Sequence, residues 1–316
     1  MTPWQRLQQI APAAIGALLF TLSIAAIRSE LRHYGWQNVL ESLQNIAKVR
    51  LLAAFGLMLV NYVILTGYDT LAMVYLRQSI TWGKTSFVGF VSYAISNSVG
   101  LALLSGSAIR YRLYQSWGLS PVIIAQAIAF CNFSFWLGLF AVGGITFMVE
   151  PLQLPAFLHL PFASVHPLGI TFLAIVVGYL IATGSHRLPL KIGKWRLPKI
   201  PLPVSFAQIG LTAADWVLAS GVLFILLPSH HHLGFAGFFG IYLLAQVSGI
   251  ISNVPGGLGV FETVVLFLLT PQFSSVQVLG ALLAYRVIYF WIPLAAASLS
   301  LGSFELWQHR QNSLSN

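Results

Sequence analysis

The fold is decided by residues 121–148, which read PVIIAQAIAFCNFSFWLGLFAVGGITFM. This run contains no Asp, Glu, Lys or Arg, and a helix needs only about 20 apolar residues to cross the hydrocarbon core of a bilayer. Comparable runs recur along the chain, and we expect transmembrane spans at 10–27, 51–76, 86–104, 121–148, 168–184, 204–227, 235–252 and 277–304. A further run, 259–270, is too short to cross alone. The sequence therefore predicts an all-α polytopic membrane protein with about eight transmembrane helices.

The composition excludes several classes of protein. Of the 316 residues, 57% are hydrophobic and only 7% are Asp, Glu, Lys or Arg, and the mean hydropathy is +0.82. Soluble domains average about 25% charged residues. A soluble enzyme, a disordered chain and a nucleic-acid binder are excluded on this ground. The single cysteine, Cys131, allows neither an intrachain disulfide nor a cysteine-based metal site, and we expect no catalytic residues, no metal and no cofactor.

We expect residues 1–316 to form one integral-membrane domain, because no length remains for an appended soluble catalytic domain. Residues 28–50 form the polar stretch of the N-terminal half, and apolar residues recur there at helical spacing from Val39 to Ala47. This pattern is typical of an amphipathic helix lying at the membrane interface. The alternative is a connector that packs on the helical bundle.

Basic residues in the loops give part of the orientation. Loop 185–203 carries five basic residues and no acid, whereas loops 149–167 and 228–234 carry no Lys or Arg. Because cytoplasmic loops are enriched in Lys and Arg, we expect 185–203 to be cytoplasmic, and Arg310 indicates a cytoplasmic C-terminus. The N-terminal side stays open, since 28–50 and the loop with Arg77 and Lys84 are both basic.

Two apolar runs are interrupted by polar residues and glycines. The first break contains Asn97 and the segment from Ser105 to Tyr114, and the second reads SNVPGGLGVFE from residue 252 to residue 262. Within the second break, the backbone is disturbed by Pro255, Gly256, Gly257 and Gly259, next to Asn253. A broken helix in lipid must be buried in protein or line a wet cavity, and paired breaks in two halves are typical of transporters with inverted repeats. The alternative is that the glycines only permit close helix packing.

Six charged residues lie within or beside the spans: Asp69, Asp215, Glu262, Arg110, Arg112 and Arg286. A charge at the centre of a spanning helix costs about 2.5–3.5 kcal/mol, so such residues usually bind or conduct a ligand. The alternative is a set of ion pairs that only fix the helix register. Arg110 and Arg112 could also reach the headgroups, and Glu262 could complement the N-terminal end of a half-helix near Gly259.

The breaks resemble a known family. The stretches GSAIRYRLY (106–114), VPGGLGVFE (254–262) and AYRVIYFWIP (284–293) are similar to the lysylphosphatidylglycerol synthase transmembrane (flippase) domain family. That domain forms the N-terminal part of the multiple peptide resistance factor, and stand-alone members also exist. The resemblance implies a lipid flippase of the bacterial cytoplasmic (inner) membrane, with aminoacylated phosphatidylglycerol such as lysyl-phosphatidylglycerol as the candidate substrate. It also implies that the partners are membrane phospholipids and a separate lipid-modifying synthase, because we expect no synthase domain in this chain.

Our hypothesis is that the breaks and the charges line a polar cavity. Arg110, Arg112 and Arg286 would hold the lipid phosphate, and Glu262, Asp69 and Asp215 would meet a cationic headgroup. The backbone around Asn97 and around 253–259 would add contacts. The alternatives are an ion-coupled secondary transporter of a small anionic solute and a non-transporting membrane scaffold. Small-residue helix faces leave a homodimer open.

Overall fold

The computed structural model describes residues 36–99, 102–149, 164–185, 191–192, 195–196, 200–228, 233–251 and 257–314. These residues are predominantly helical, so the predicted all-α polytopic class is confirmed. Five of the helices are long and apolar enough to cross a membrane. The predicted span at 10–27 lies outside the described residues, as do 28–35 and much of the loops 149–167, 185–203 and 228–234.

The five long helices match predicted spans. They are α3 (Lys48–Tyr75), α6 (Pro121–Val149), α7 (His166–Gly184), α8 (Leu202–Leu226) and a continuous helix composed of α11 (Ser275–Tyr285), η3 (Arg286–Trp291) and α12 (Ile292–Leu314). The shorter elements are α2 (Trp36–Gln44), α4 (Trp82–Val99), α5 (Ala102–Ser116), α9 (Phe235–Ile251), α10 (Val260–Leu269) and two antiparallel strands, β1 (Lys191–Ile192) and β2 (Trp195–Arg196).

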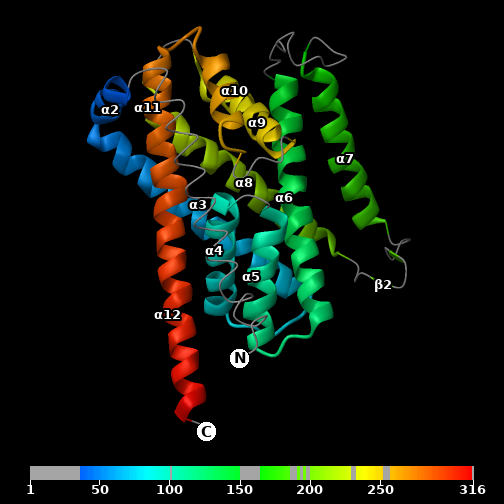
Figure 1. Cartoon of the computed structure of the whole chain (residues 1–316). Helices are drawn as coiled ribbons and strands as arrows, with labels where there is room; N and C mark the ends of the chain where they lie inside the picture. The colour runs from blue at the N-terminus through cyan, green and yellow to red at the C-terminus, as the bar shows by residue number, and fades with distance from the viewer. Residues whose placement is uncertain are drawn as a thin grey trace.

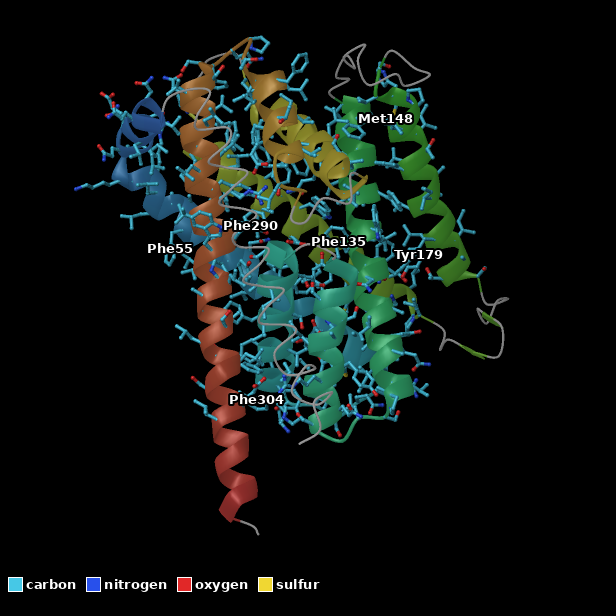
Figure 2. All side chains as sticks on the ribbon, viewed as in Figure 1. Phe55, Phe135, Met148, Tyr179, Phe290 and Phe304 are labelled. Atoms are coloured by element: carbon cyan, nitrogen blue, oxygen red, sulfur yellow. The ribbon has the colours of Figure 1, made fainter. Side chains whose placement is uncertain are left out.

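Apolar side chains cover the outside of the bundle, and polar side chains gather inside it. Phe55 and Met148 project outward (Figure 2), and Val63, Ile181 and Leu299 are among the most exposed large apolar side chains. Buried positions include aspartates, arginines, serines and tyrosines. This distribution suits a chain surrounded by lipid, where exposed polar groups would find no partner.

Two pairs of short helices stand where breaks were predicted, but the first break is placed wrongly by the sequence. Helix α4 ends at Val99, and the segment from Ser105 to Tyr114, predicted as part of the break, is helical in α5, which packs on α4. The run at 235–252 forms α9, which packs on α10. Helix α10 has 10 residues and extends about 15 Å, half the thickness of a bilayer core. We call these two pairs, α4–α5 and α9–α10, the hairpins.

The order long helix, hairpin, long helix occurs twice in the chain. The first set is α3, α4, α5 and α6, and the second is α8, α9, α10 and the α11–η3–α12 helix. Figure 1 shows α4 and α5 toward the end of the bundle where the C-terminus lies, and α9 and α10 toward the opposite end. The two leading helices, α3 and α8, cross in contact with each other. This order of elements is that of an inverted repeat, one of the alternatives that the paired breaks in the sequence left open.

Helix α2 packs on the bundle, as one of the two alternatives for residues 28–50 requires. It contacts α11, and Val39 on its apolar face is fully buried. Leu43 and Ile46 also pack against the core. The described part of this segment therefore contributes its apolar face to protein contacts.

Helices α3 and α4 approach so closely at Gly89 that no side chain fits there. A Cβ atom on Gly89 would lie 2.9 Å from the Cα of Thr66 and 3.3 Å from Oδ2 of Asp69. We expect Gly89→Ala to lower the free energy of unfolding by about 1–3 kcal/mol, because the backbones must separate. Gly83→Ala is the matched control on the same helix, since no atom lies within 4 Å of its added Cβ. Detergent unfolding of both variants in mixed micelles measures the difference, and equal stability of the two would contradict this packing.

Candidate functional site

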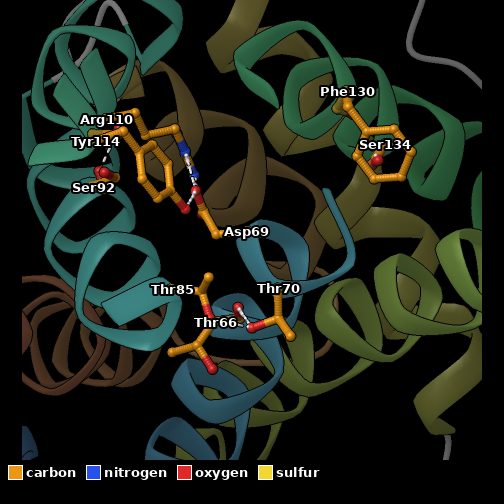
Figure 3. Close-up of polar contacts among 10 residues, drawn as sticks. Thr66, Asp69, Thr70, Thr85, Ser92, Arg110, Tyr114, Phe130 and Ser134 are labelled. Carbon is orange, nitrogen blue, oxygen red and sulfur yellow. Dashed lines mark hydrogen bonds and ion pairs between the residues drawn. The ribbon is translucent and has the colours of Figure 1, made fainter. Parts of the chain in front are cut away.

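The first buried ion pair joins the α4–α5 hairpin to α3. Arg110 of α5 donates from Nε to Oδ1 of Asp69 at 2.9 Å and from Nη2 to Oδ2 at 2.9 Å. Tyr114, one turn farther along α5, donates its hydroxyl to Oδ1 of the same carboxylate at 3.0 Å (Figure 3). Asp69 is fully buried and Arg110 is 3% exposed. A two-point guanidinium–carboxylate contact fixes both the charge and the geometry of this pair.

The Arg110 guanidinium also faces an aromatic ring. Its central carbon lies 4.6 Å from the centre of the Tyr93 ring of α4. The ring of Tyr93 in turn lies 5.2 Å, between ring centres, from that of Tyr68 of α3. Arg110 is therefore held by a carboxylate on one side and by an aromatic face on another, which stabilises a cation away from water.

The second buried ion pair joins the α9–α10 hairpin to the long C-terminal helix. Arg286, the first residue of η3, donates from Nε to Oε1 of Glu262 at 2.6 Å, and its Nη2 contacts the same oxygen. The other carboxylate oxygen of Glu262 accepts from the backbone N–H of Gly259 at 2.8 Å. The guanidinium lies 4.6 Å from the centre of the Phe290 ring.

Glu262 thus has the two roles that the sequence left as alternatives. It caps the start of α10 through Gly259, whose φ of 79° suits glycine, and it pairs with Arg286. Gly257 has a φ of 62° and lies against Gly249 of α9. The glycines of this break therefore shape the start of α10 and let α9 approach it.

Asp215 of α8 lies in a third buried cluster, at the crossing of α8 with α3. The Nδ2 of Asn61 donates to Oδ1 of Asp215 at 2.9 Å, and the hydroxyl of Tyr68 donates to Oδ2 at 2.8 Å. The hydroxyl of Tyr289, in η3, donates to Oδ1 of Asn61 at 2.5 Å. Two neutral side chains from α3 therefore hold this carboxylate, and Asn61 also links it to η3.

The backbone of η3 supplies carbonyl groups to the same region. Pro293 has no N–H, so the carbonyl of Tyr289 four residues earlier lacks its usual helical partner. The hydroxyl of Tyr62 donates to that carbonyl at 3.2 Å, and the hydroxyl of Ser98 at the end of α4 donates to the carbonyl of Phe290 at 3.3 Å. Figure 2 shows Phe290 midway along the continuous helix. A π-helical turn at such a place is typical of functional sites.

We expect Tyr62→Phe to lower the free energy of unfolding by about 0.5–1.5 kcal/mol, because it removes the side-chain hydrogen bond to the buried Tyr289 carbonyl. Pro293→Ala should compensate, since its new N–H lies four residues after that carbonyl. The measurement is a double-mutant cycle of the two variants by unfolding in mixed micelles. Additive effects of the two substitutions would show that the tyrosine does not serve this carbonyl.

The three clusters are connected through ring contacts and hydrogen bonds. Tyr68 donates to Asp215 and packs against Tyr93, which covers Arg110. On the other side, the Tyr289 ring is stacked on Tyr285, with 5.2 Å between ring centres, directly next to Arg286. Tyrosine side chains, with Asn61 between Tyr289 and Asp215, therefore lead from one ion pair, past Asp215, toward the other.

Arg112 lies apart from Arg110 and Arg286. Two positions beyond Arg110 on the same helix, it points away from the buried pair and contacts Glu305 of α12 at 2.9 Å. The Arg112 side chain is 56% exposed and that of Glu305 is 34% exposed. The structure thus brings five of the six predicted charged residues into buried clusters and leaves Arg112 at the surface, as the headgroup alternative expects.

The remaining predicted residues belong to the breaks. Asn97 is partly buried near the end of α4, within reach of the Tyr62 hydroxyl. Asn253, Pro255 and Gly256 lie outside the described residues. Five residues of these contacts were not predicted from the sequence: Asn61, Tyr68, Tyr114, Tyr289 and Glu305. For Asn61 the available signal was its polar side chain within the apolar run at 51–76.

Comparison with known proteins agrees with these features. The family model described as "Lysylphosphatidylglycerol synthase TM region" matches residues 9–297. The chain belongs to this family. A Synechocystis sp. protein, slr0712, is 77% identical over 311 residues, covering 98% of this chain and 97% of its own length. The Escherichia coli inner membrane protein YbhN is 29% identical over 293 residues, covering 92% and 91% of the two chains.

The family also includes longer proteins. The Bacillus subtilis phosphatidylglycerol lysyltransferase is 26% identical over 284 residues, which cover 88% of this chain but 32% of the lysyltransferase. The alignment therefore reaches only the membrane region that defines the family. Membership places this chain in the membrane, in agreement with its five long apolar helices.

Proposed function

We propose that this chain moves a phospholipid between the leaflets of the bacterial cytoplasmic membrane, with aminoacylated phosphatidylglycerol as the candidate substrate. The observation that carries the proposal is the pair of buried arginine–carboxylate contacts. Each contact ties a hairpin to a long helix, and the two hairpins enter from opposite ends of the bundle. A membrane protein seldom buries charged groups unless they meet a ligand. The family name and the lysyltransferase relatives favour a lipid of this type.

The chemistry of the two pairs fits an exchange of partners. A phosphodiester could take the place of a carboxylate on Arg110 or Arg286, because both anions accept two parallel hydrogen bonds from a guanidinium. The released carboxylate, Asp69 or Glu262, could then bind the ammonium group of an aminoacyl headgroup. Every charge would keep a partner during the exchange, which avoids the cost of an unpaired buried ion. The acyl chains would stay in lipid.

Two such pairs at opposite hairpins would serve the two leaflets in turn. The clusters around Asp215 and η3 lie between them and would give the headgroup polar contacts on the way. We further propose that loop 185–203 and the C-terminus face the cytoplasm, and that a separate synthase supplies the modified lipid. The basic residues of that loop and the inner membrane location of the relative YbhN support this placement.

The test is lipid translocation by purified protein in liposomes. Fluorescent lysyl-phosphatidylglycerol, phosphatidylglycerol and phosphatidylethanolamine are placed in one leaflet, and a membrane-impermeant quencher measures how fast each reaches the other leaflet. We expect the wild-type protein to accelerate movement of the lysyl lipid above that in protein-free liposomes. Arg110→Ala should abolish the acceleration and Arg112→Ala should retain it. No acceleration for any of the three lipids would refute the proposal.

The same liposomes distinguish the two alternative functions. Uptake of a small anionic solute without lipid movement would indicate a secondary transporter. Full tolerance of substitutions at Asp69, Arg110, Glu262 and Arg286 would indicate a scaffold, because a scaffold needs no exchangeable charges.

A further inference from the structure

Buried charge is unbalanced in the part of the chain that the structure describes. Its buried charged residues are three acids, Asp69, Asp215 and Glu262, and two bases, Arg110 and Arg286. Arg110 is bound to Asp69, and Arg286 is bound to Glu262. Among the described residues, the hydrogen-bond donors to the Asp215 side chain are the neutral Asn61 and Tyr68. An ionised carboxylate without a counter-ion is costly within a membrane domain, whereas a protonated one is neutral.

The contacts of Asp215 suit both protonation states. The Asn61 amide requires Oδ1 as an acceptor in either state. The Tyr68 hydroxyl donates to Oδ2 when the carboxylate is charged, and it can rotate to accept from a protonated Oδ2 because a hydroxyl is both donor and acceptor. Asp215 can therefore gain or lose a proton without losing either neighbour.

Asp69 is built for the opposite behaviour. Among the described residues, the side-chain donors to its two oxygens are the Arg110 guanidinium and the Tyr114 hydroxyl. The guanidinium carries a full positive charge and has no acceptor, so a protonated Asp69 would lose its charge partner and its fork of hydrogen bonds. Asp69 thus offers an internal control within the same bundle.

The titratable groups that face Asp215 from the neighbouring helices are neutral phenols. They come from α3, α4, α9 and η3, and they are Tyr62, Tyr68, Tyr93, Tyr242 and Tyr289. A phenolic hydroxyl can both donate and accept a hydrogen bond, and intramembrane carboxylates take part in proton relays in pumps and transporters. The position of Asp215 between the two ion pairs connects it to both hairpins.

We propose that Asp215 is a proton-binding site whose occupancy is coupled to lipid movement, so that a proton gradient drives the exchange. The inference rests on the proposed lipid movement. In one cycle the Asp215 carboxylate takes up one proton from water on one side as a carboxylic acid, and it releases that proton to water on the other side. No other chemical bond forms or breaks. One obligatory proton limits the effect to about tenfold in rate per pH unit.

Proton binding is tested first without any transport. Infrared difference spectra of purified protein in lipid nanodiscs, recorded between acidic and alkaline pH, report the carbonyl stretch of a protonated carboxyl group. We expect a titrating band in wild type that Asp215→Asn removes and Asp69→Asn retains. Tyr68→Phe keeps the aromatic ring but removes a hydrogen-bond donor to the charged Asp215 carboxylate. The band of the protonated carboxyl group should therefore persist to more alkaline pH. An unchanged band in Asp215→Asn would overturn the proton site.

Coupling is tested second, in liposomes that carry fluorescent lysyl-phosphatidylglycerol and an imposed pH difference. Wild-type translocation should change with the size and sign of that difference, and Asp215→Asn should lose the dependence. Asp215→Glu, which keeps a carboxyl group, should retain it. A wild-type rate indifferent to the pH difference would overturn the coupling while leaving the proposed lipid movement intact. No lipid movement at all, with the infrared band present, would instead refute the proposed function.

Discussion

Arg286→Ala is expected to reduce lipid movement to the rate of protein-free liposomes and to lower the free energy of unfolding by about 3–5 kcal/mol. The reason is that Glu262 would remain buried with a negative charge and without its guanidinium partner. Detergent unfolding in mixed micelles measures the stability, and the quenching assay measures the movement. Glu262→Gln should act in the same direction, because it removes the carboxylate charge that faces the buried Arg286 cation.

A double variant separates structure from function at this pair. Arg286→Met with Glu262→Gln removes both charges, and the glutamine can still accept from the Gly259 N–H that the glutamate caps. Replacing both members of a buried pair is often neutral for stability, so the double variant should unfold within about 1 kcal/mol of wild type. We expect it to remain inactive. Recovery of lipid movement in this variant would mean that the pair only holds the helices together.

Arg110→Ala is expected to have an effect of similar size at the other hairpin. It would leave Asp69 fully buried with the Tyr114 hydroxyl as its remaining side-chain donor among the described residues, at a cost of about 3–5 kcal/mol. Arg110→Lys keeps the charge but loses the two-point contact, and it should fall in between, at about 1–3 kcal/mol. Lipid movement should vanish in the first variant and be reduced in the second.

Arg112→Ala is the matched control for Arg110→Ala, two positions away on the same helix. Its partner Glu305 is partly exposed, and exposed ion pairs contribute about 0–1 kcal/mol. Stability and lipid movement should therefore stay close to wild type. If Arg110→Ala and Arg112→Ala were equally harmful, the distinction between buried and surface charge on α5 would not hold.

Most of the fold could be predicted from the sequence, because lipid imposes a simple length rule on helices. Each of the five long helices agrees with a predicted run to within a few residues at the start. The run at 86–104 corresponds mainly to α4, and the polar, glycine-containing segment 105–114 that was predicted as a break is helical in α5. That α4 and α5 fold back on each other depends on contacts with α3 and α6, which no local pattern encodes.

The sequence predicts which types of residue form the site, but it predicts only in part which acidic residue pairs with which basic residue. Charges within apolar runs identified Asp69, Arg110, Asp215, Glu262 and Arg286 as unusual. Which acid meets which base depends on how helices far apart in the chain cross, as Asp69 and Arg110 show. Arg112 shows most clearly what the sequence does not reveal. It lies two positions from Arg110 on α5, and the two differ only in the direction in which their side chains leave the helix. The tyrosines around Asp215 gave no signal, since aromatic residues are frequent throughout this chain.

The π-helical turn from Arg286 to Trp291 amounts to one surplus residue in an otherwise regular rod. Because a π turn holds more residues per turn than an α turn, it takes up the surplus residue locally and leaves the helix beyond it in the phase of an uninterrupted α-helix. Excising a single amino acid there would therefore allow ordinary winding from Ser275 to Leu314 and still leave Glu305 facing Arg112. Homologues one residue shorter at this point would keep the same contact between the C-terminal helix and the rest of the molecule.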